Sequence, residues 1–303
     1  MKGLSFLTAS IALVLATHAQ AATPPAPQHY SNAAWTQPQK PFRIYGNTYY
    51  VGSHGLSAIL VTSPRGHILL DGTLPENVPM IEANIRALGF RLEDVKLILN
   101  SHPHFDHAGG IAALAHDTGA QVVASAKAAK ALKLGGEDPD DPQYGDASPY
   151  AKVEHVRIAD GGETIKLGPL ALTMHPTPGH TPGGTAWTWT SCEQTRCLSM
   201  AYVDSIALLT ANNGHYRYTD PAHPERIADF RGTIDTLAKL PCDIMIAPHP
   251  DSINLIEKAT QHGGNNPDAL IDPNACKAYA AKAQVNLDER IAKENAKSKS
   301  PAR

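Results

Sequence analysis

The sequence predicts a single α/β domain, and three observations support this prediction. Its 303 residues are 42% hydrophobic and 18% charged, which is enough apolar material for a large buried core. Apolar segments with the period of strands alternate with segments of helical period, as expected when strands and helices form layers around one core. Fifteen histidines occur, and several follow predicted strands, where the site residues of α/β proteins gather.

The first 21 residues have the pattern of a secretory signal peptide. A basic start at Lys2 is followed by a mostly apolar run from Leu4 to Ala16 and by the small-polar-small tract that ends at Ala21. The run is shorter than the ~20 residues of a membrane span, so we expect cleavage after Ala21 or one residue later and export to the periplasm. An uncleaved amphipathic helix is the alternative. The cleavage site has no cysteine that could carry a lipid anchor.

The remaining elements follow in order from residue 22. Residues 22–41 are rich in proline, alanine and glutamine, which predicts an irregular arm. Residues 135–150 lack periodicity and predict a long surface loop of a kind that is often functional. The basic residues 298–303 are expected to fray as a tail, so the domain spans 42–297. Strands are predicted at 44–51, 56–62, 67–70, 95–99, 121–124, 164–167, 170–175, 185–190, 198–203 and 243–247, and helices at 77–88, 110–118, 127–134, 224–239 and from about 274 onward.

Export makes the four cysteines informative, because disulfides are expected in an oxidising compartment. Four cysteines allow three pairings. Cys192 and Cys197 flank a polar turn between two predicted strands, so we expect the disulfide Cys192–Cys197 to close this hairpin. The remaining pair, Cys242–Cys276, would tie the strand near residue 244 to the last helix. A zinc site built from cysteines is the alternative, but the spacing lacks paired C-x-x-C motifs.

A dense group of metal-binding side chains follows the predicted strand at 95–99. His102, His104, Asp106 and His107 fall within six residues and precede a pair of glycines and a helix. Such a group is costly to bury without a partner, and a bound cation would supply one. The sequence therefore predicts a metal site at the end of this strand.

Two further histidines also follow predicted strands. His180 lies in a turn rich in glycine and proline after the strand at 170–175, and His249 follows the strand at 243–247. Taken alone, either histidine would more often be structural. Together with the cluster they predict a site for two metals, although the spacing does not divide the ligands between the two ions.

These residues resemble the metallo-β-lactamase superfamily, and more narrowly its subclass B3. The resemblance covers nearly all of the chain after the signal peptide and implies an αββα four-layer sandwich with the metals at one edge. The motifs that carry the resemblance are H-x-H-x-D-H at 102–107, Gly-His-Thr at 179–181, Leu-Leu-Asp-Gly at 69–72, His249, the tracts 100–110 and 178–190, Asp204-Ser205, and Pro241-Cys242-Asp243 with Cys276.

The charge pattern is not that of a nucleic-acid-binding surface, because the net charge is −3 and no basic block is interleaved with aromatic residues.

The resemblance implies two Zn²⁺ ions per chain and hydrolysis of the β-lactam amide bond of penicillins, cephalosporins and carbapenems. The nucleophile would be a metal-bound hydroxide, since metal binding lowers the pKa of water to about 7. Asp106 would also orient this hydroxide, and Asp71 would accept a hydrogen bond from a ligand histidine unless it is an ordinary turn residue. We expect a monomer with a small-molecule β-lactam substrate, no nucleic-acid or membrane partner, and a role in antibiotic resistance. The implied ligands are His102, His104 and His180 for the first zinc and Asp106, His107 and His249 for the second.

Asp204 decides between two kinds of enzyme on this fold. In related glyoxalase II enzymes and lactonases an aspartate at this point bridges both metals, whereas B3 enzymes have Asp-Ser here and no such bridge. Because Ser205 follows Asp204, we expect the non-bridging role. The second serine usual in subclass B3 is replaced by Ala207, so Ser205 and Asn212 are the expected substrate-binding residues. Further candidates near the pocket are Thr210, Asn213, His215 and Tyr216.

An exported zinc β-lactamase is thus the leading hypothesis, and two alternatives remain. The first is another exported two-zinc hydrolase of the same fold, a lactonase or thioesterase, in which Asp204 bridges the metals. The second is a zinc-binding protein without activity, which is disfavoured because six ligands with room for water make an open site rather than a closed structural one.

Overall fold

A computed structural model describes residues 32–212, 216–264 and 266–299. The predicted signal peptide and residues 22–31 of the predicted arm lie outside these described residues. So do Asn213, His215 and the last four residues of the predicted basic tail.

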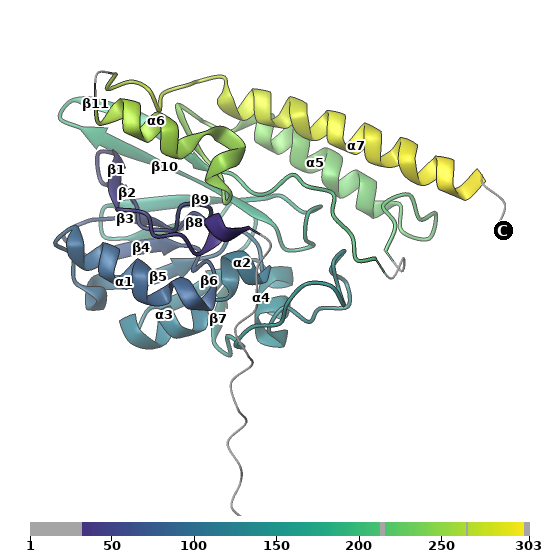
Figure 1. The fold of residues 1–303 in the computed structure, drawn as a ribbon, viewed down its shortest axis with the longest axis horizontal. Coiled ribbons are helices and arrows are strands. Elements are labelled where there is room, and N and C mark those ends of the chain that lie inside the picture. Colours follow the sequence, from purple (N-terminus) through teal and green to yellow (C-terminus); the bar gives the residue numbers. More distant parts are fainter. Residues whose placement is uncertain (1–31, 213–215, 265, 300–303) are drawn as a thin grey trace, which may run out of the picture. The chain divides into compact units, whose positions relative to one another are not determined.

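Two sheets form the centre of the described part of the chain (Figure 1). In the first sheet, β4, β5, β6 and β7 run parallel, and the hairpin strands before them are antiparallel. The second sheet is antiparallel except that β12 pairs in parallel with β11. The first sheet has the order β1 (Phe42–Tyr45), β2 (Thr48–Tyr50), β3 (Ile59–Val61), β4 (His67–Leu70), β5 (Val95–Leu99), β6 (Gln121–Ala124), β7 (Val156–Ile158), and the second has the order β12 (Ile244–Ile246), β11 (Arg196–Tyr202), β10 (Thr185–Glu193), β9 (Leu170–Pro176), β8 (Thr164–Leu167).

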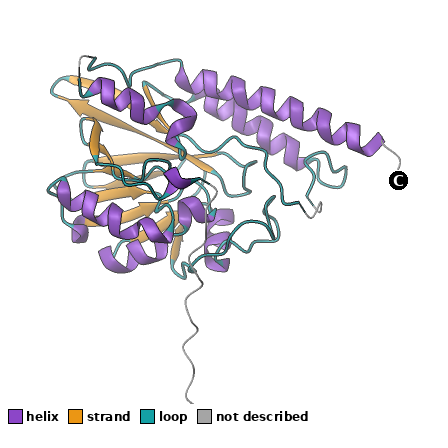
Figure 2. Ribbon diagram, in the orientation of Figure 1, coloured by secondary structure: helices purple, strands orange, loops and turns teal. Residues whose placement is uncertain are grey.

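Helices cover the outer faces of both sheets, as the colouring in Figure 2 shows. Apolar residues of α1 (Val78–Ala87), α3 (Ile111–Thr118) and α4 (Ala126–Leu134) pack on the first sheet. Those of α5 (Glu225–Lys239) and α7 (Ala275–Lys299) pack on the second. The predicted αββα sandwich is therefore confirmed. None of the helices in the described ranges combines the length and apolarity that crossing a membrane requires.

The core between the sheets is built around buried aromatic side chains whose polar atoms are all satisfied. The indole nitrogen of Trp187 on β10 donates to the carbonyl oxygen of Asn100, which follows β5. The indole nitrogen of Trp189 donates to the hydroxyl of Thr48 on β2, and both of these hydrogen bonds are 3.0 Å long. A buried indole N–H needs such a partner. These contacts fix the second sheet against the first and against the segment that leads into His102.

Several predicted elements coincide with the observed ones, including β4, β5, β6 and β8. The predicted strand 44–51 is instead the hairpin β1–β2, because Gly46 adopts a positive φ of 52° and turns the chain. The sequence does not predict β7, a short edge strand with mostly exposed residues, or α6 (Leu255–His262), a two-turn helix beside the core between the sheets. The last helix continues to Lys299 rather than ending before the basic tail.

Both predicted disulfides are present. Cys192–Cys197 closes the β10–β11 hairpin, and Cys242–Cys276 ties the segment before β12 to the first turn of α7. One turn further along α7, the Tyr279 hydroxyl donates to the carbonyl oxygen of Asp204 at 3.0 Å. The second disulfide therefore holds α7 close to the predicted site.

Replacing both Cys242 and Cys276 with serine should lower the free energy of unfolding by about 4 kcal/mol, because this disulfide closes a loop with a sequence separation of 34 residues. The same change at Cys192 and Cys197, separated by 5 residues, should cost only about 2 kcal/mol. Equilibrium unfolding of the metal-free protein in urea measures both losses. Equal losses would contradict the loop-length argument.

Candidate metal centre

The predicted ligand histidines meet because the strands that precede them end at one edge of the sandwich. His102 follows β5, His180 follows β9 and His249 follows β12. The segment before His102 is held by a hydrogen bond from the Thr185 backbone N–H on β10 to the Ser101 carbonyl, at 2.7 Å. His104 is the N-cap of the short helix α2 (Phe105–Ala108), which carries Asp106 and His107.

His102, His104 and His180 form a first buried group. One potential ligand atom from each lies within 4.8 Å of the others. The ring centroids of the three imidazoles are 4.7–5.0 Å apart. Because the three side chains come from two separate turns, only the tertiary fold brings them together.

Each ring of this first group has one nitrogen bound to a buried acceptor. Nδ1 of His102 donates to Oδ1 of Asp204 at 2.8 Å, and Nδ1 of His180 donates to the Ala207 carbonyl at 2.6 Å. Nε2 of His104 donates to both carboxylate oxygens of Asp141, each at 3.1 Å. A neutral imidazole with one N–H so engaged keeps a lone pair on its other nitrogen.

The lone pair on Nε2 of His102 has no hydrogen-bond partner although the atom is fully buried. A buried polar atom left in this state is costly, and a cation is the partner that would satisfy it. Burial and the neighbouring histidines lower the pKa of His102 well below its ordinary value, and burial lowers the pKa of His180 to about 3. Both rings are therefore neutral at physiological pH, which is the protonation state a metal ligand requires.

His104 differs from the other two rings in its charge environment. Burial alone would lower the pKa of His104, but the adjacent Asp141 carboxylate raises it above the ordinary value. Burial would also raise the pKa of Asp141, and the His104 ring lowers it instead. The Asp141 carboxylate and the imidazole of His104, a potential metal ligand, thus stabilise each other's charged forms.

Asp106, His107 and His249 form a second group beside the first. Nε2 of His107 lies 3.2 Å from Nε2 of His249 and 3.2 Å from Oδ2 of Asp106, which is 3.5 Å from the His249 nitrogen. Ligand atoms of a tetrahedral zinc site with bonds near 2.0–2.1 Å are separated by about 3.3 Å, so this spacing suits a cation. Burial is the main effect that lowers the pKa of His249 to about 4, and the electrostatic effect of the neighbouring His107 ring adds to it. Burial would raise the pKa of Asp106, but the charge of His107 holds it below its usual range.

Asp204 lies behind His102. Its Oδ1 accepts from His102 and from the Ser205 backbone N–H at 2.7 Å, and its Oδ2 accepts from the Thr177 hydroxyl at 3.2 Å. A Cβ on Gly184 would come within 2.1 Å of Oδ2, so the fit around this carboxylate depends on glycine. With both oxygens engaged in this way, the geometry favours orientation of His102 over a bridge between two metals.

The predicted contact between Asp71 and a ligand histidine is not observed. Asp71 is buried and accepts hydrogen bonds from the Ser101 backbone and hydroxyl, from Asn100 and from the Tyr202 hydroxyl, at 2.6–3.0 Å. None of its hydrogen-bond partners in the described ranges is a histidine. Asp71 therefore supports the backbone that leads into His102, and Asp204 holds the ring itself.

The predicted substrate-binding residues lie in the segment after Asp204. Ser205 is 8% exposed, and its backbone is tied to Asp204. The backbone and side chain of Asn212 both donate to Oδ2 of Asp146, and Thr210 accepts from Arg290 of α7. Their roles toward a substrate stay predictions.

Two neighbours of the site were not predicted individually. Asp141 belongs to the aperiodic loop predicted at residues 135–150, but nothing in the sequence distinguishes it from Asp138 or Asp140. The Trp35 ring, from the arm, lies 5.7 Å from the His249 ring between centroids. No periodic pattern in the sequence could indicate either contact.

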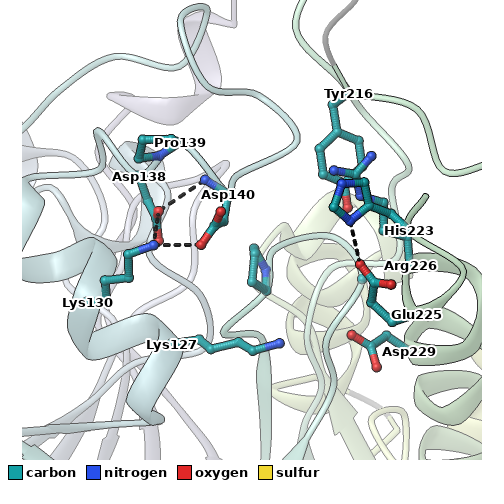
Figure 3. A pocket seen from close by; sticks show the side chains of 12 residues that line it. Lys127, Lys130, Asp138, Pro139, Asp140, Tyr216, His223, Glu225, Arg226 and Asp229 are labelled. Carbon is teal, nitrogen blue, oxygen red and sulfur yellow. Dashed lines mark hydrogen bonds and ion pairs between the residues drawn. The ribbon is translucent and has the colours of Figure 1, made fainter. Parts of the chain in front are cut away.

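A cavity of about 400 Å³ lies next to the His180 turn (Figure 3). On one side it is lined by Lys127 and Lys130 of α4 and by the 138–140 turn, and on the other by Tyr216 and by Arg226 of α5. Gly179 and Pro182, on either side of His180, also line it. The Arg226 guanidinium lies over the Tyr216 ring at 3.8 Å.

Similar proteins are known by sequence and by structure. A sequence model of the metallo-beta-lactamase superfamily matches residues 52–192. The structure of the Rm3 metallo-beta-lactamase has a TM-score of 0.84 and 49% identity, covering 89% of this chain and 100% of that one. MEM-A1, a subclass B3 metallo-beta-lactamase isolated from a soil metagenome library, has a TM-score of 0.83 and 48% identity, covering 87% of this chain and 99% of that one.

A curated relative is similar over a shorter stretch. A hydroxyacylglutathione hydrolase of Anaeromyxobacter dehalogenans (strain 2CP-C) is 39% identical over 92 residues, which is 30% of this chain. The chain spans 28% of the length of that relative in this match. The similarity to Rm3 and MEM-A1, in contrast, extends over nearly the whole of both of those structures.

Replacing Asp204 with alanine should lower zinc affinity by about 10–100-fold, because His102 loses the acceptor that fixes its ring. Asp204→Asn should lose less, since an amide oxygen can still accept from Nδ1. Competition with a chromophoric chelator measures both, with Thr177→Val as the control that removes only the hydroxyl on the other oxygen. Equal, large losses for the alanine and asparagine variants would indicate a bridging ligand instead.

Proposed function

The chain belongs to the metallo-β-lactamase superfamily, and we propose that it hydrolyses the β-lactam amide bond of penicillins, cephalosporins and carbapenems with the help of two zinc ions. The observation that carries this proposal is the buried group of three imidazoles, His102, His104 and His180, each with one ring nitrogen hydrogen-bonded to a buried acceptor and the other directed toward its neighbours in the group. The similarity to β-lactamases over nearly their whole length supports the same conclusion.

The side chains present fit zinc. Imidazole nitrogens and a carboxylate are typical zinc ligands, and an open site leaves room for water and substrate. His102, His104 and His180 would hold one ion, and Asp106, His107 and His249 the other. Zinc in such a site supplies Lewis acidity and a water-derived nucleophile at neutral pH.

The chain's own residues prepare the reaction. The depressed pKa of Asp106, caused by His107 against the effect of burial, keeps this carboxylate ionised, so it can accept a hydrogen bond from the attacking water and orient it. Ser205 and Asn212 would contact the substrate carboxylate. Because His180 uses the backbone carbonyl of residue 207, the presence of alanine there leaves the metal site intact.

The alternative hydrolase class requires a different role for Asp204. A thioesterase or lactonase on this fold would use Asp204 as a bridge, whereas its oxygens are hydrogen-bonded to His102, Ser205 and Thr177. Over a comparable part of the chain the likeness to a hydroxyacylglutathione hydrolase is also weaker, with 25% identity over 73% of this chain for the enzyme of Jannaschia sp. (strain CCS1) against 49% over 89% for the Rm3 structure. Both observations favour the β-lactamase.

Export to the periplasm and a role in antibiotic resistance belong to the same proposal. The signal-peptide pattern of residues 1–21 supports export. The two disulfides support it too, because such bonds persist in oxidising compartments. We propose that the enzyme acts there as a monomer on a small-molecule substrate.

The purified protein should hydrolyse a chromogenic cephalosporin and a carbapenem, lose this activity in a chelator and regain it when zinc is added. S-lactoylglutathione serves as the comparison substrate and should not be turned over. Two bound zinc ions with thioester hydrolysis and no β-lactam turnover would contradict the proposal in favour of the alternative class.

Asp106→Ala and His249→Ala should each reduce the zinc content from two ions to one per chain and lower kcat by at least about 100-fold. Elemental analysis and steady-state kinetics measure these effects. His116→Ala, at a side chain that is 88% exposed on α3, is the control and should change neither. Full activity in either ligand variant would exclude a two-zinc mechanism.

A further inference from the structure

We infer that Asp141 is a positioning residue that fixes the tautomer of His104 and thereby makes the α4–β7 segment (residues 135–155) part of the metal centre. The inference rests on the proposed metal-dependent function and deepens it. Neither the motif that contains His104 nor any similarity described above assigns a role to Asp141.

The contact itself is short, buried and symmetric. Asp141 is 4% exposed, and both of its carboxylate oxygens lie 3.1 Å from Nε2 of His104. The Gln143 backbone N–H donates to Oδ1 of Asp141 at 2.7 Å and so orients the carboxylate. An ionised carboxylate only accepts hydrogen bonds, so Nε2 carries a hydrogen. The side-chain amide nitrogen of Gln143, which is a donor, lies 3.4 Å from Nδ1, and this contact fits a lone pair on Nδ1.

This tautomer is the reverse of the one that the acceptors beside the other two histidines of the group favour. His102 and His180 donate from Nδ1, to Asp204 and to the Ala207 carbonyl, and are left with Nε2. His104 therefore needs a dedicated acceptor on its Nε2 side. Asp141 is the carboxylate that occupies this place.

The segment that carries Asp141 is anchored independently of His104. Lys130 of α4 forms ion pairs with Asp138 and Asp140 at 2.7 and 2.6 Å, as Figure 3 shows. Further along, the Tyr150 hydroxyl donates to the Pro103 carbonyl at 2.6 Å. Loss of the Asp141 carboxylate would consequently leave the course of the segment largely in place.

The same segment also contacts the support of a second histidine. The Ala211 N–H donates to the Pro142 carbonyl at 2.8 Å, and Asn212 donates to Asp146. These residues follow Ala207, whose carbonyl holds His180. The α4–β7 segment is thereby linked to the supports of two of the three histidines.

The experiment compares Asp141→Ala, Asp141→Asn and the control Asp140→Ala, which removes an exposed carboxylate of the same segment and leaves the Asp138–Lys130 pair. The first readout is the tautomer of His104 in the metal-free protein, from the ring ¹⁵N chemical shifts of histidine-labelled samples. The second is zinc affinity, from competition with a chelator. Thermal unfolding of each metal-free variant reports whether it folds.

Wild-type His104 should be the Nε2–H tautomer. Asp141→Ala should give a mixture of tautomers and weaken binding of the first zinc by about 10–100-fold. Asp141→Asn should keep the tautomer, because its amide oxygen can accept, and weaken binding by about 3–10-fold through the loss of charge. Asp140→Ala should match the wild type in both readouts.

An unchanged tautomer and affinity in Asp141→Ala, or an equal loss of affinity in Asp140→Ala, would overturn the inference. If Asp141→Ala does not fold, unchanged zinc affinity in Asp141→Asn overturns it. Neither readout depends on turnover. A wild-type protein that binds zinc but does not hydrolyse β-lactams would therefore contradict the proposed function and leave this test valid.

Discussion

A buried imidazole that presents a lone pair to a cation needs an acceptor for its other nitrogen, and the rest of this structure is arranged to supply three such acceptors. They are a carboxylate after β11, a backbone carbonyl in the following loop and a carboxylate in the α4–β7 segment. Each comes from a different part of the chain, so the rings can be oriented only after the whole sandwich has formed. The candidate site is for this reason a property of the tertiary fold rather than of one motif.

Asp71 connects this edge of the sandwich to the second group of ligands. It sits in the left-handed region with φ of 61°, a cost of about 1 kcal/mol or more for a non-glycine residue. Its burial raises the pKa of the carboxyl, and the donors from Ser101 and Tyr202 oppose that effect. Tyr202 also contacts the Ser57 carbonyl, and the Ser57 hydroxyl donates to Ala247, two residues before His249. One polar network thus reaches the backbone next to both ligand groups.

The sequence predicted what short motifs and periodicity can encode. The strand ends before His102, His180 and His249, the layered fold and both disulfides follow from local patterns and from the resemblance of the motifs. The structure brings the six predicted side chains together in two adjacent groups. The sequence does not indicate which residues accept hydrogen bonds from the ligand histidines, because bonds such as His104–Asp141 join residues 37 positions apart. For the same reason the sequence predicts a hydrogen bond from a ligand histidine to Asp71, whereas in the structure Asp204 accepts that bond from His102.

Anomalous diffraction at the zinc edge from crystals of the zinc-loaded protein tests the central claim most directly. We expect two peaks per chain, one beside Nε2 of His102, Nδ1 of His104 and Nε2 of His180, and one beside Asp106, His107 and His249. The carboxylates of Asp204 and Asp141 should remain hydrogen-bonded to their histidines, outside the coordination spheres. A peak bound directly by Asp204, or by Nε2 of His104, would contradict it.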